Sequence, residues 1–280
     1  MQASVTMNQP AILITGVSSG IGLVTAAHLL DRGMRVYGSV RSDDAPAELA
    51  AREGFTPLTF DVRDRAAVRE AVSVIRQRGD VLVGLVNNAG VAIPGPVETL
   101  SEEEYRRQFD VNVLGLIGVC QETLPLLHAA RERGERPRIV NVSSVSGYLT
   151  APYMTFYSAS KFAVEALTDG LRRELLPFGI DVVSVAPGPT KTPIWEKGST
   201  LLEAFQDNRY DHLHDQIGPY TEAAHRGGVE PEAVAEAIFA ALTATKPKPH
   251  VLIMNKRWLA RLVRHMPKRM QDRFLTKRTR

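Results

Sequence analysis

Short apolar runs alternate with longer stretches of mixed polarity along most of the chain. The runs end at glycine, proline or polar residues, as buried β-strands do, whereas the mixed stretches are long enough for helices with one apolar side. The apolar runs predict strands at 11–15, 35–40, 81–86, 138–142, 180–186 and 251–254, and the end of a further strand at 58–61. The mixed stretches predict helices at 20–32, 46–52, 66–76, 101–109, 113–131 and 157–176.

Strand and helix signals that alternate in this way indicate a parallel sheet with helices on both faces, because such strands are buried on both sides and joined by crossovers. The chain carries no internal repeat, low-complexity tract or interdomain linker. We therefore expect one α/β domain over residues 1–255, a doubly wound parallel sheet of about seven strands. A helical lid is expected at 193–228 and a helical tail at 256–280.

The composition is that of a soluble globular protein, with 44% hydrophobic and 23% charged residues in 280. Cys120 is the only cysteine, which excludes an internal disulfide and a cysteine-based zinc site. Residues 1–10 lack the basic and apolar regions of a secretory signal, and no apolar run approaches the ~20 residues of a membrane span. These features predict a cytoplasmic protein.

The positive charge is concentrated at the C-terminus. Residues 256–280 contain ten of the 34 Lys and Arg residues and one of the 31 acids, so this segment carries a formal charge of +9. Residues 1–255 keep 24 basic and 30 acidic side chains and carry −6. The body of the protein is therefore not expected to bind nucleic acid.

The basic tail also has an apolar stripe. Its members recur every four residues and are interrupted near Pro267: Trp258, Leu262, Met266, Met270 and Phe274. This pattern predicts an amphipathic helix with a break or kink at the proline. Two interpretations stay open, since the stripe could pack on the body or could dock reversibly on an anionic membrane surface.

A glycine-rich turn follows the first predicted strand, in the sequence Thr15-Gly16-Val17-Ser18-Ser19-Gly20-Ile21-Gly22. Glycines at a strand-to-helix turn let the backbone approach a pyrophosphate closely, and the following helix offers free N–H groups and its positive dipole end. The turn therefore indicates a dinucleotide site in the first βα unit.

Tyr157 and Lys161 are four residues apart on a predicted helix and therefore share one face. A free tyrosine ionises near pH ~10, and a cation beside it favours the phenolate and lowers its pKa. Such a pair is able to give a proton to a carbonyl oxygen or take one from an alcohol.

Taken together, the motifs resemble the short-chain dehydrogenase/reductase family. They comprise the glycine turn, the run Asn87-Asn88-Ala89-Gly90, Asn112, Ser144 thirteen residues before Tyr157, the Tyr157–Lys161 pair, and the run 187–192 after the sixth strand. The resemblance covers about residues 9–255. It implies a Rossmann-like fold and an NAD(P)-dependent oxidoreductase that acts on CH–OH groups.

The resemblance implies four catalytic residues. Tyr157 would exchange the proton, and Ser144 would hydrogen-bond the same substrate oxygen. Lys161 would lower the pKa of Tyr157 and hold the nicotinamide ribose. Asn112 would position a water in a proton relay from Lys161 to solvent.

The resemblance also implies the cofactor contacts. Besides Tyr157 and Lys161 they are Gly16, Ser18, Ser19, Gly20, Ile21, Gly22, Arg41, Asp61, Val62, Asn88, Ala89, Gly90, Pro187, Gly188, Thr190 and Thr192. Val40 stands where NAD-preferring relatives usually carry an acid, and Arg41 could pair with the 2′-phosphate of NADP. NADP is therefore favoured over NAD, although Asp43 and Asp44 could compete for Arg41.

The expected substrate is an apolar alcohol, ketone or aldehyde. The segments 91–96 and 145–154, with Ile194 and Trp195, are mostly apolar and carry no cluster of basic residues that would hold a phosphate or carboxylate. They resemble relatives that act on steroids or retinoids, so an NAD-dependent hydroxysteroid or retinol dehydrogenase is an alternative.

Two other classes of protein are less well supported. A non-catalytic cofactor sensor would have lost the Tyr, Lys or Ser, and epimerases or dehydratases of nucleotide sugars usually have another glycine spacing and a larger C-terminal domain. His212 and His214 do not predict a metal site, because residues two apart on a helix point in different directions. The resemblance further implies a homodimer or homotetramer built on the helices that contain 113–131 and 157–176.

Overall fold

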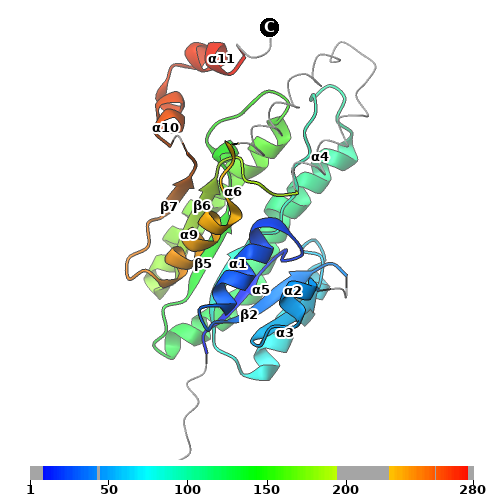
Figure 1. The fold of residues 1–280 in the computed structure, drawn as a ribbon, viewed down its shortest axis with the longest axis vertical. Coiled ribbons are helices and arrows are strands. Elements are labelled where there is room, and N and C mark those ends of the chain that lie inside the picture. Colours follow the sequence, from blue (N-terminus) through cyan, green and yellow to red (C-terminus); the bar gives the residue numbers. More distant parts are fainter. Residues whose placement is uncertain (1–8, 43–44, 194–226, 256, 277–280) are drawn as a thin grey trace, which may run out of the picture.

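The computed structural model describes residues 9–42, 45–193, 227–255 and 257–276. Their strands form one parallel sheet in the order β3-β2-β1-β4-β5-β6-β7, which confirms the doubly wound architecture (Figure 1). The strands are β1 (Ala11–Ile14), β2 (Arg35–Val40), β3 (Phe55–Thr59), β4 (Leu82–Asn87), β5 (Arg138–Val142), β6 (Asp181–Pro187) and β7 (His250–Ile253).

The central strands are apolar at nearly every position because both of their faces are covered. In β1, Leu13 belongs to the hydrophobic core on one side of the sheet, whereas Ile12 and Ile14 belong to the core on the other side. All three side chains are at most 1% exposed. The two-residue period of a strand therefore distributes one apolar run between two cores.

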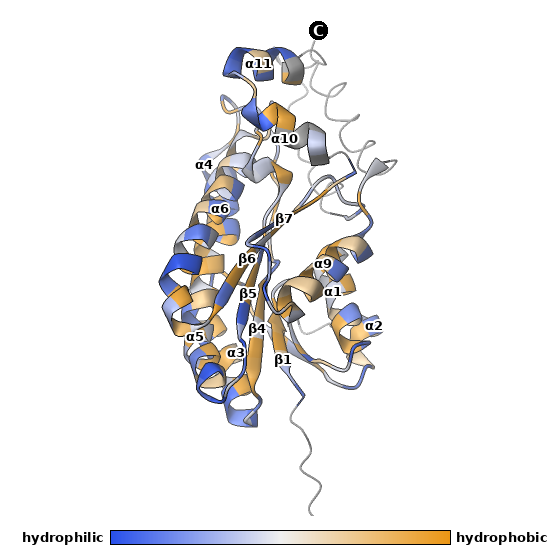
Figure 2. Cartoon of the chain, turned by 90° about the vertical axis from the view of Figure 1, so that its left-hand side faces the viewer, coloured by the Kyte–Doolittle hydropathy of each residue, from blue (hydrophilic) through white to orange (hydrophobic). Residues whose placement is uncertain are grey.

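Two helical layers cover the sheet, and Figure 2 shows them on opposite sides of the strands. One layer contains α1 (Gly20–Leu30), α2 (Ala47–Ala50) and α9 (Pro231–Thr243). The other contains α3 (Arg65–Arg78), α4 (Glu102–Phe109), α5 (Leu116–Glu132) and α6 (Thr155–Leu175). Short 3₁₀ turns, η2 (Val145–Gly147) and η3 (Leu176–Phe178), precede and follow α6.

The sequence pattern placed the end of the third strand at 58–61 without defining its beginning, and strand β3 runs from Phe55 to Thr59. The strand includes Pro57 opposite Gly38 of β2, at the edge of the sheet. A proline is tolerated there because an edge strand leaves one row of N–H groups unpaired.

Helix α9 was not predicted from the sequence. It begins at Pro231, a residue that suits the first helical turn, and it buries Val234, Ile238 and Leu242 against α1 and the sheet. Residues 194–226 of the predicted lid lie outside the described residues.

The two helices predicted at 101–109 and 113–131 form one continuous helical segment. A π-helical turn, η1 (Asp110–Gly115), joins α4 to α5 and holds Asn112. Single π turns of this kind occur often at functional sites. The segment 102–132 is, among the described residues, the one helix long and apolar enough to cross a membrane, and it packs on β4 as part of the core.

Two helices, α10 (Arg257–His265) and α11 (Lys268–Thr276), follow β7. They are separated at Met266 and Pro267, as the proline predicted. Both extend beyond the end of the sheet (Figures 1 and 2). Val263 is buried, and the Gln271 side chain joins the two helices by donating to the backbone oxygens of Arg264 and Met266.

Candidate active site

One cavity of about 380 Å³ lies at the carboxyl ends of the strands. Strand β1 has β2 on one side and β4 on the other, so the chain direction across the sheet switches there, and ligands bind at such points in open α/β sheets. All the predicted site residues except Gly22 and Asn112 line the cavity: Gly16, Ser18, Ser19, Gly20, Ile21, Arg41, Asp61, Val62, Asn88, Ala89, Gly90, Ser144, Tyr157, Lys161, Pro187, Gly188, Thr190 and Thr192.

The glycine turn is packed too closely for side chains. A Cβ atom on Gly22 would lie 2.1 Å from the Gly16 carbonyl oxygen and 2.4 Å from Nδ2 of Asn88. Gly16 itself has a φ of +73° and lies against the backbone of Ala89. Both glycines are therefore required by the path of the backbone, although Gly22 does not line the cavity.

Polar side chains from neighbouring strands hold this turn. Asn88 donates from Nδ2 to the carbonyl oxygens of Thr15 and Gly16, both at 2.9 Å. The Thr15 hydroxyl accepts from the backbone N–H groups of Asn88 and Ala89, and the Ser39 hydroxyl accepts from that of Gly16 at 2.8 Å. Asn88 thus fixes the turn through its side chain as well as lining the cavity.

Helix α1 presents its N-terminus to the cavity. Ser19 is its N-cap, and the Ser19 side chain makes no capping hydrogen bond. The first N–H groups of the helix are therefore not satisfied by a capping side chain, and its positive dipole end favours an anion. A close-packed glycine turn followed by such a helix fits the pyrophosphate of a dinucleotide.

The ends of β2 and β3 bring two arginines to the same part of the cavity. Arg41 lines it, and so does Arg63, which holds Asp61 by two hydrogen bonds of 3.0 and 2.8 Å. The hydrogen bonds from Arg63 lower the pKa of Asp61, and the positive charge of Arg41 adds a smaller effect. Asp43 and Asp44, the predicted competitors for Arg41, lie outside the described residues.

Tyr157, Lys161 and Ser144 line the same cavity. Tyr157 and Lys161 come from the first turns of α6, and Nζ of Lys161 lies 6.0 Å from the centre of the Tyr157 ring. Ser144 caps the turn η2, where its hydroxyl accepts from the N–H of Ser146 at 3.1 Å. All three side chains are less than 9% exposed.

Lys161 is buried as a potential cation. Nζ donates to the carbonyl oxygen of Val142 at 2.9 Å. Burial lowers the pKa of Lys161 to about 8, and the negative charge of Glu165 opposes this shift. Lys161 can therefore change its charge close to neutral pH.

Asn112 lies behind the cavity rather than in its wall. Its amide accepts from the N–H of Val91 and donates to the carbonyl oxygen of the same residue, both at 2.9 Å, and also donates to the Ser160 hydroxyl at 3.0 Å. Asn112 thereby ties the π turn to α6 and to the segment after β4. Its Oδ1 and Nζ of Lys161 both lie close to Gly90.

The segment after β6 forms part of the cavity wall. The N–H of Gly188 donates to the carbonyl oxygen of Ile253 in β7 at 2.7 Å, and Thr190 forms a β-bridge with Val229. The Thr190 hydroxyl donates to the carbonyl oxygen of Gly188 at 3.0 Å. These bonds hold Pro187, Gly188, Thr190 and Thr192 along the cavity wall.

Several lining residues were not predicted. They are Ser39, Phe60, Arg63, Arg107, Val111, Val142 and Ser143. Most of them end or follow a strand directly beside a predicted residue, so strand ends alone could have indicated them. Arg107 of α4 and Val111 of η1 are four residues apart and share one side of the helical segment. No sequence pattern around them indicates that this side faces the cavity.

The described residues contain neither a reactive thiol nor a cluster of metal-binding side chains. The thiol of Cys120 is buried, and burial raises its pKa to about 12, so it is an unreactive core group. The described residues hold no group of three or more His, Cys, Asp or Glu side chains placed to bind a metal ion. His212 and His214 lie outside them.

Comparison with known proteins agrees with this geometry. The family model of the short chain dehydrogenases matches residues 10–201. An NADPH-dependent 3-dehydrocapnine reductase from Ornithobacterium rhinotracheale is 36% identical over 272 residues, which cover 95% of each chain. A 3-ketodihydrosphingosine reductase from Bacteroides thetaiotaomicron is 36% identical over 233 residues, or 83% of each chain.

The fold has a similar match. A crystal structure of a short-chain dehydrogenase from Streptomyces avermitilis superposes with a TM-score of 0.78, at 27% identity and with 98% of each chain covered. This chain belongs to the short-chain dehydrogenase/reductase family and is an NAD(P)-dependent oxidoreductase.

Proposed function

We propose that this protein reduces a long-chain apolar ketone to a secondary alcohol with NADPH, using Tyr157, Ser144, Lys161 and Asn112. The observation that carries the proposal is that Tyr157, Ser144 and Lys161 line the same cavity as the glycine turn and the segment after β6. The residues that handle protons therefore lie within one site with those that would hold a dinucleotide.

The proposed chemistry assigns a separate task to each side chain. When bound, the nicotinamide cofactor supplies the hydride. Tyr157 gives its phenolic proton to the substrate oxygen as negative charge develops there, and Ser144 donates a hydrogen bond to the same oxygen. The Lys161 ammonium favours the phenolate that remains.

Asn112 would support proton return to Tyr157. Its side-chain amide is hydrogen-bonded to Val91 and Ser160, and these bonds fix the backbone of the π turn close to Lys161. A water held by that backbone would link Lys161 to solvent. This role follows from the family resemblance and from the position of Asn112 beside Gly90.

NADP is the preferred cofactor in this proposal. Arg41 lines the cavity directly after β2, and no acid ends that strand, so a 2′-phosphate would meet a cation there. The similarity to an NADPH-dependent reductase supports the same choice. Arg41→Ala should raise the KM for NADPH at least tenfold and leave that for NADH within twofold; equal changes for both cofactors would contradict the assignment.

The substrate class rests on the cavity wall and on the relatives. Ala92 and Tyr157 line the cavity, and Met154 and Ala151 pack against them as a small apolar cluster. An apolar surface at this place suits an alkyl chain beside the reacting carbonyl. Reductases named for 3-dehydrocapnine and 3-ketodihydrosphingosine are similar to this chain over most of its length.

A substrate panel with both cofactors tests the proposal. We expect NADPH oxidation with long-chain 3-ketones such as 3-ketodihydrosphingosine, and at least tenfold lower kcat/KM with acetone-sized ketones. Turnover confined to steroid ketones or retinal would favour the hydroxysteroid or retinol type instead. Cofactor binding without turnover of any compound would favour a sensor.

We further infer that α10 and α11 dock on an anionic membrane surface, where a lipid-like substrate would be found. Trp258 and Leu262, one turn apart on α10, are 65% and 50% exposed, and Met270 of α11 is 52% exposed. The same two helices carry exposed basic residues, which are Arg264, Lys268, Arg269 and Arg273. Exposed apolar groups among cations suit the interface of an anionic bilayer.

Vesicle sedimentation tests the docking. The wild type should bind vesicles that contain phosphatidylserine, more weakly at high salt, and Trp258→Ser with Leu262→Ser should weaken binding at least tenfold. Leu176→Ser is the matched control, because Leu176 is 63% exposed on the 3₁₀ turn after α6. Equal binding of all three proteins would contradict docking through α10.

A homodimer or homotetramer is also proposed, through α5 and α6 with the adjoining π turn. Leu114 on η1 and Phe162 on α6 are large apolar side chains with 61% and 44% exposure. Light scattering after size exclusion should give a mass of two or four chains, which Leu114→Asp with Phe162→Asp should reduce to one.

A further inference from the structure

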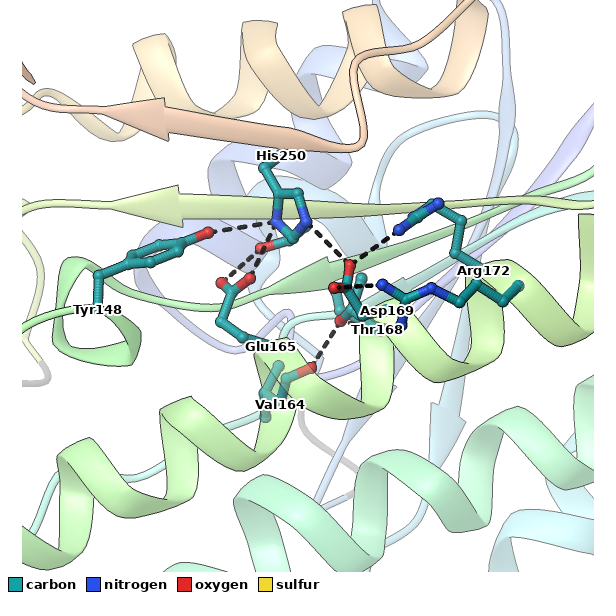
Figure 3. Close-up of polar contacts among 10 residues, drawn as sticks. Tyr148, Val164, Glu165, Thr168, Asp169, Arg172 and His250 are labelled. Carbon is teal, nitrogen blue, oxygen red and sulfur yellow. Dashed lines mark hydrogen bonds and ion pairs between the residues drawn. The ribbon is translucent and has the colours of Figure 1, made fainter. Parts of the chain in front are cut away.

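A network of charged and polar side chains lies beside the turn η2, which Ser144 caps, and its members do not line the cavity (Figure 3). Its centre is Glu165 of α6, which is 8% exposed. Oε1 of Glu165 accepts from the Ser184 hydroxyl of β6 at 2.6 Å, and Oε2 lies 3.1 Å from Nδ1 of His250. This carboxylate is therefore held from two strands at once.

His250, the first residue of β7, bridges two carboxylates. Its Nε2 lies 3.0 Å from Oδ1 of Asp169, which also accepts from Arg172 at 3.1 Å. The Tyr148 hydroxyl lies 3.3 Å from Nδ1 of His250. Figure 3 shows His250 pointing between the side chains of Glu165 and Asp169.

Glu165 is one helical turn beyond Lys161, so the two side chains share a face of α6. The turn that carries Ser144 packs on the same place, because a Cβ on Gly147 would lie 3.0 Å from both Cγ of Glu165 and the backbone oxygen of Lys161. Glu165 therefore lies directly behind the Ser144 turn and beside the Tyr157–Lys161 pair, without lining the cavity.

The charges around Glu165 come from several elements. His250 faces it from β7 and Tyr148 from the end of η2, while Asp169 and Arg172 continue along α6. Arg264 of α10 lies over the Tyr148 ring, 4.7 Å from its centre. Burial raises the pKa of Tyr148, and the Glu165 charge raises it further, so Tyr148 stays a neutral hydrogen-bond donor.

Within the described part of the chain, Glu165 is the charged residue that acts on buried Lys161. Burial alone disfavours the ammonium, and the negative charge of Glu165 restores part of its stability. Lys161 must be charged to stabilise the phenolate of Tyr157, so the carboxylate supports catalysis from behind.

We propose that Glu165 is a positioning residue of the Tyr157–Lys161 pair: held by Ser184 and His250, its carboxylate keeps the Lys161 ammonium charged in the working enzyme. This role rests on the proposed catalytic use of Lys161. It assigns a function to the polar network, which takes no direct part in the reaction.

The pH dependence of kcat tests this role. In Glu165→Gln, which keeps the shape and removes the charge, the pH above which NADPH-dependent reduction falls should move down by about one unit. Glu165→Asp should recover at least half of that displacement. Asp169→Asn is the matched control, because it removes a carboxylate from the same network two turns from Lys161 and should leave the pH limb in place.

A measurement without turnover separates this inference from the proposed function. The difference in unfolding free energy between the wild type and Lys161→Met reports the titration of Lys161 and should fade as the pH rises above about 8. The same difference in a Glu165→Gln background should fade about one pH unit lower. If the pH at which the difference begins to fade is the same in both backgrounds, the role of Glu165 is refuted, whether or not a substrate is found. If that pH shifts but no compound is turned over, the role of Glu165 stands and only the proposed reaction is contradicted.

Discussion

At the scale of single residues, close packing and buried charge define the site. The glycine turn, the Asn88 side chain and the helix N-terminus pack so closely that a methyl group on Gly22 would collide with the backbone of the turn. Lys161 is buried as a cation with one backbone acceptor and one nearby carboxylate. Both features reduce the tolerance of these positions to substitution, and each gives a direct prediction.

Gly22→Ala should abolish dinucleotide binding. The new Cβ would overlap the Gly16 carbonyl oxygen at 2.1 Å, so the turn must move away from its present path. We expect at least a hundredfold weaker binding of NADPH, measured by fluorescence titration. Gly170→Ala is the control: nothing lies within 4 Å of its added Cβ, and this helical position should gain about 0.5–1 kcal/mol of stability. Equal binding by both variants would contradict this requirement for close packing.

Lys161→Met should stabilise the cofactor-free protein at pH 7. The lysine has a pKa of about 8 in the folded chain and ~10.4 when unfolded, so burying its charge below pH 8 costs about 3 kcal/mol. Losing the hydrogen bond to Val142 offsets about 1 kcal/mol.

The sign of the pH dependence follows from the bound protons. Between pH 8 and pH 10 the unfolded chain binds more protons than the folded one, so the wild type gains stability as the pH rises and the advantage of Lys161→Met disappears. Urea unfolding at pH 7 and pH 10 measures this. A variant less stable than the wild type at pH 7 would be inconsistent with a buried ammonium.

At the scale of elements, the sequence predicted the strands better than the helices around them. Strand β5 begins and ends at the predicted residues 138 and 142, because Ile139, Val140 and Val142 form a short apolar run typical of a buried strand. Helix α9 has the same apolar spacing as other helices, but it follows a segment without clear signals and was overlooked. The π turn around Asn112 arises from packing against α6 and the segment after β4, which no local pattern encodes.

Ile238→Ala should show that α9 is part of the core. Ile238 is fully buried between α1 and the sheet, so truncation should lower the free energy of unfolding by about 2–4 kcal/mol. Because α9 does not line the cavity, kcat at 25 °C should stay within twofold. Glu232→Ala, at an exposed position of the same helix, should change stability by less than about 0.5 kcal/mol.

At the scale of the whole molecule, the fold collects residues from six strand ends into one cavity. Gly16, Arg41, Asp61, Asn88, Ser144 and Pro187 belong to different βα units and meet because parallel strands all end at the same edge. The sequence could predict this meeting from the order of motifs. It could not predict Arg63 pairing with Asp61, or Glu165 held by Ser184 and His250, because these contacts depend on side-chain geometry between elements.

The C-terminal helices give the molecule a second, basic end. Helix α10 contacts the body through Arg264, which lies over the Tyr148 ring. The formal charge of +9 in residues 256–280 is separated from a body of −6. In the proposed docking, this asymmetry would turn the basic end of the protein toward an anionic surface.

The most direct test of the central claim is deuterium transfer from NADPH labelled at the transferable position of its nicotinamide to a long-chain ketone, followed by mass spectrometry of the alcohol. The wild type should place one deuterium on the carbinol carbon. Tyr157→Phe should bind NADPH with similar affinity and give at least a hundredfold less labelled alcohol. Labelled alcohol at a near wild-type rate from Tyr157→Phe would contradict its role as the proton donor, and an unlabelled alcohol from the wild type would contradict hydride transfer itself.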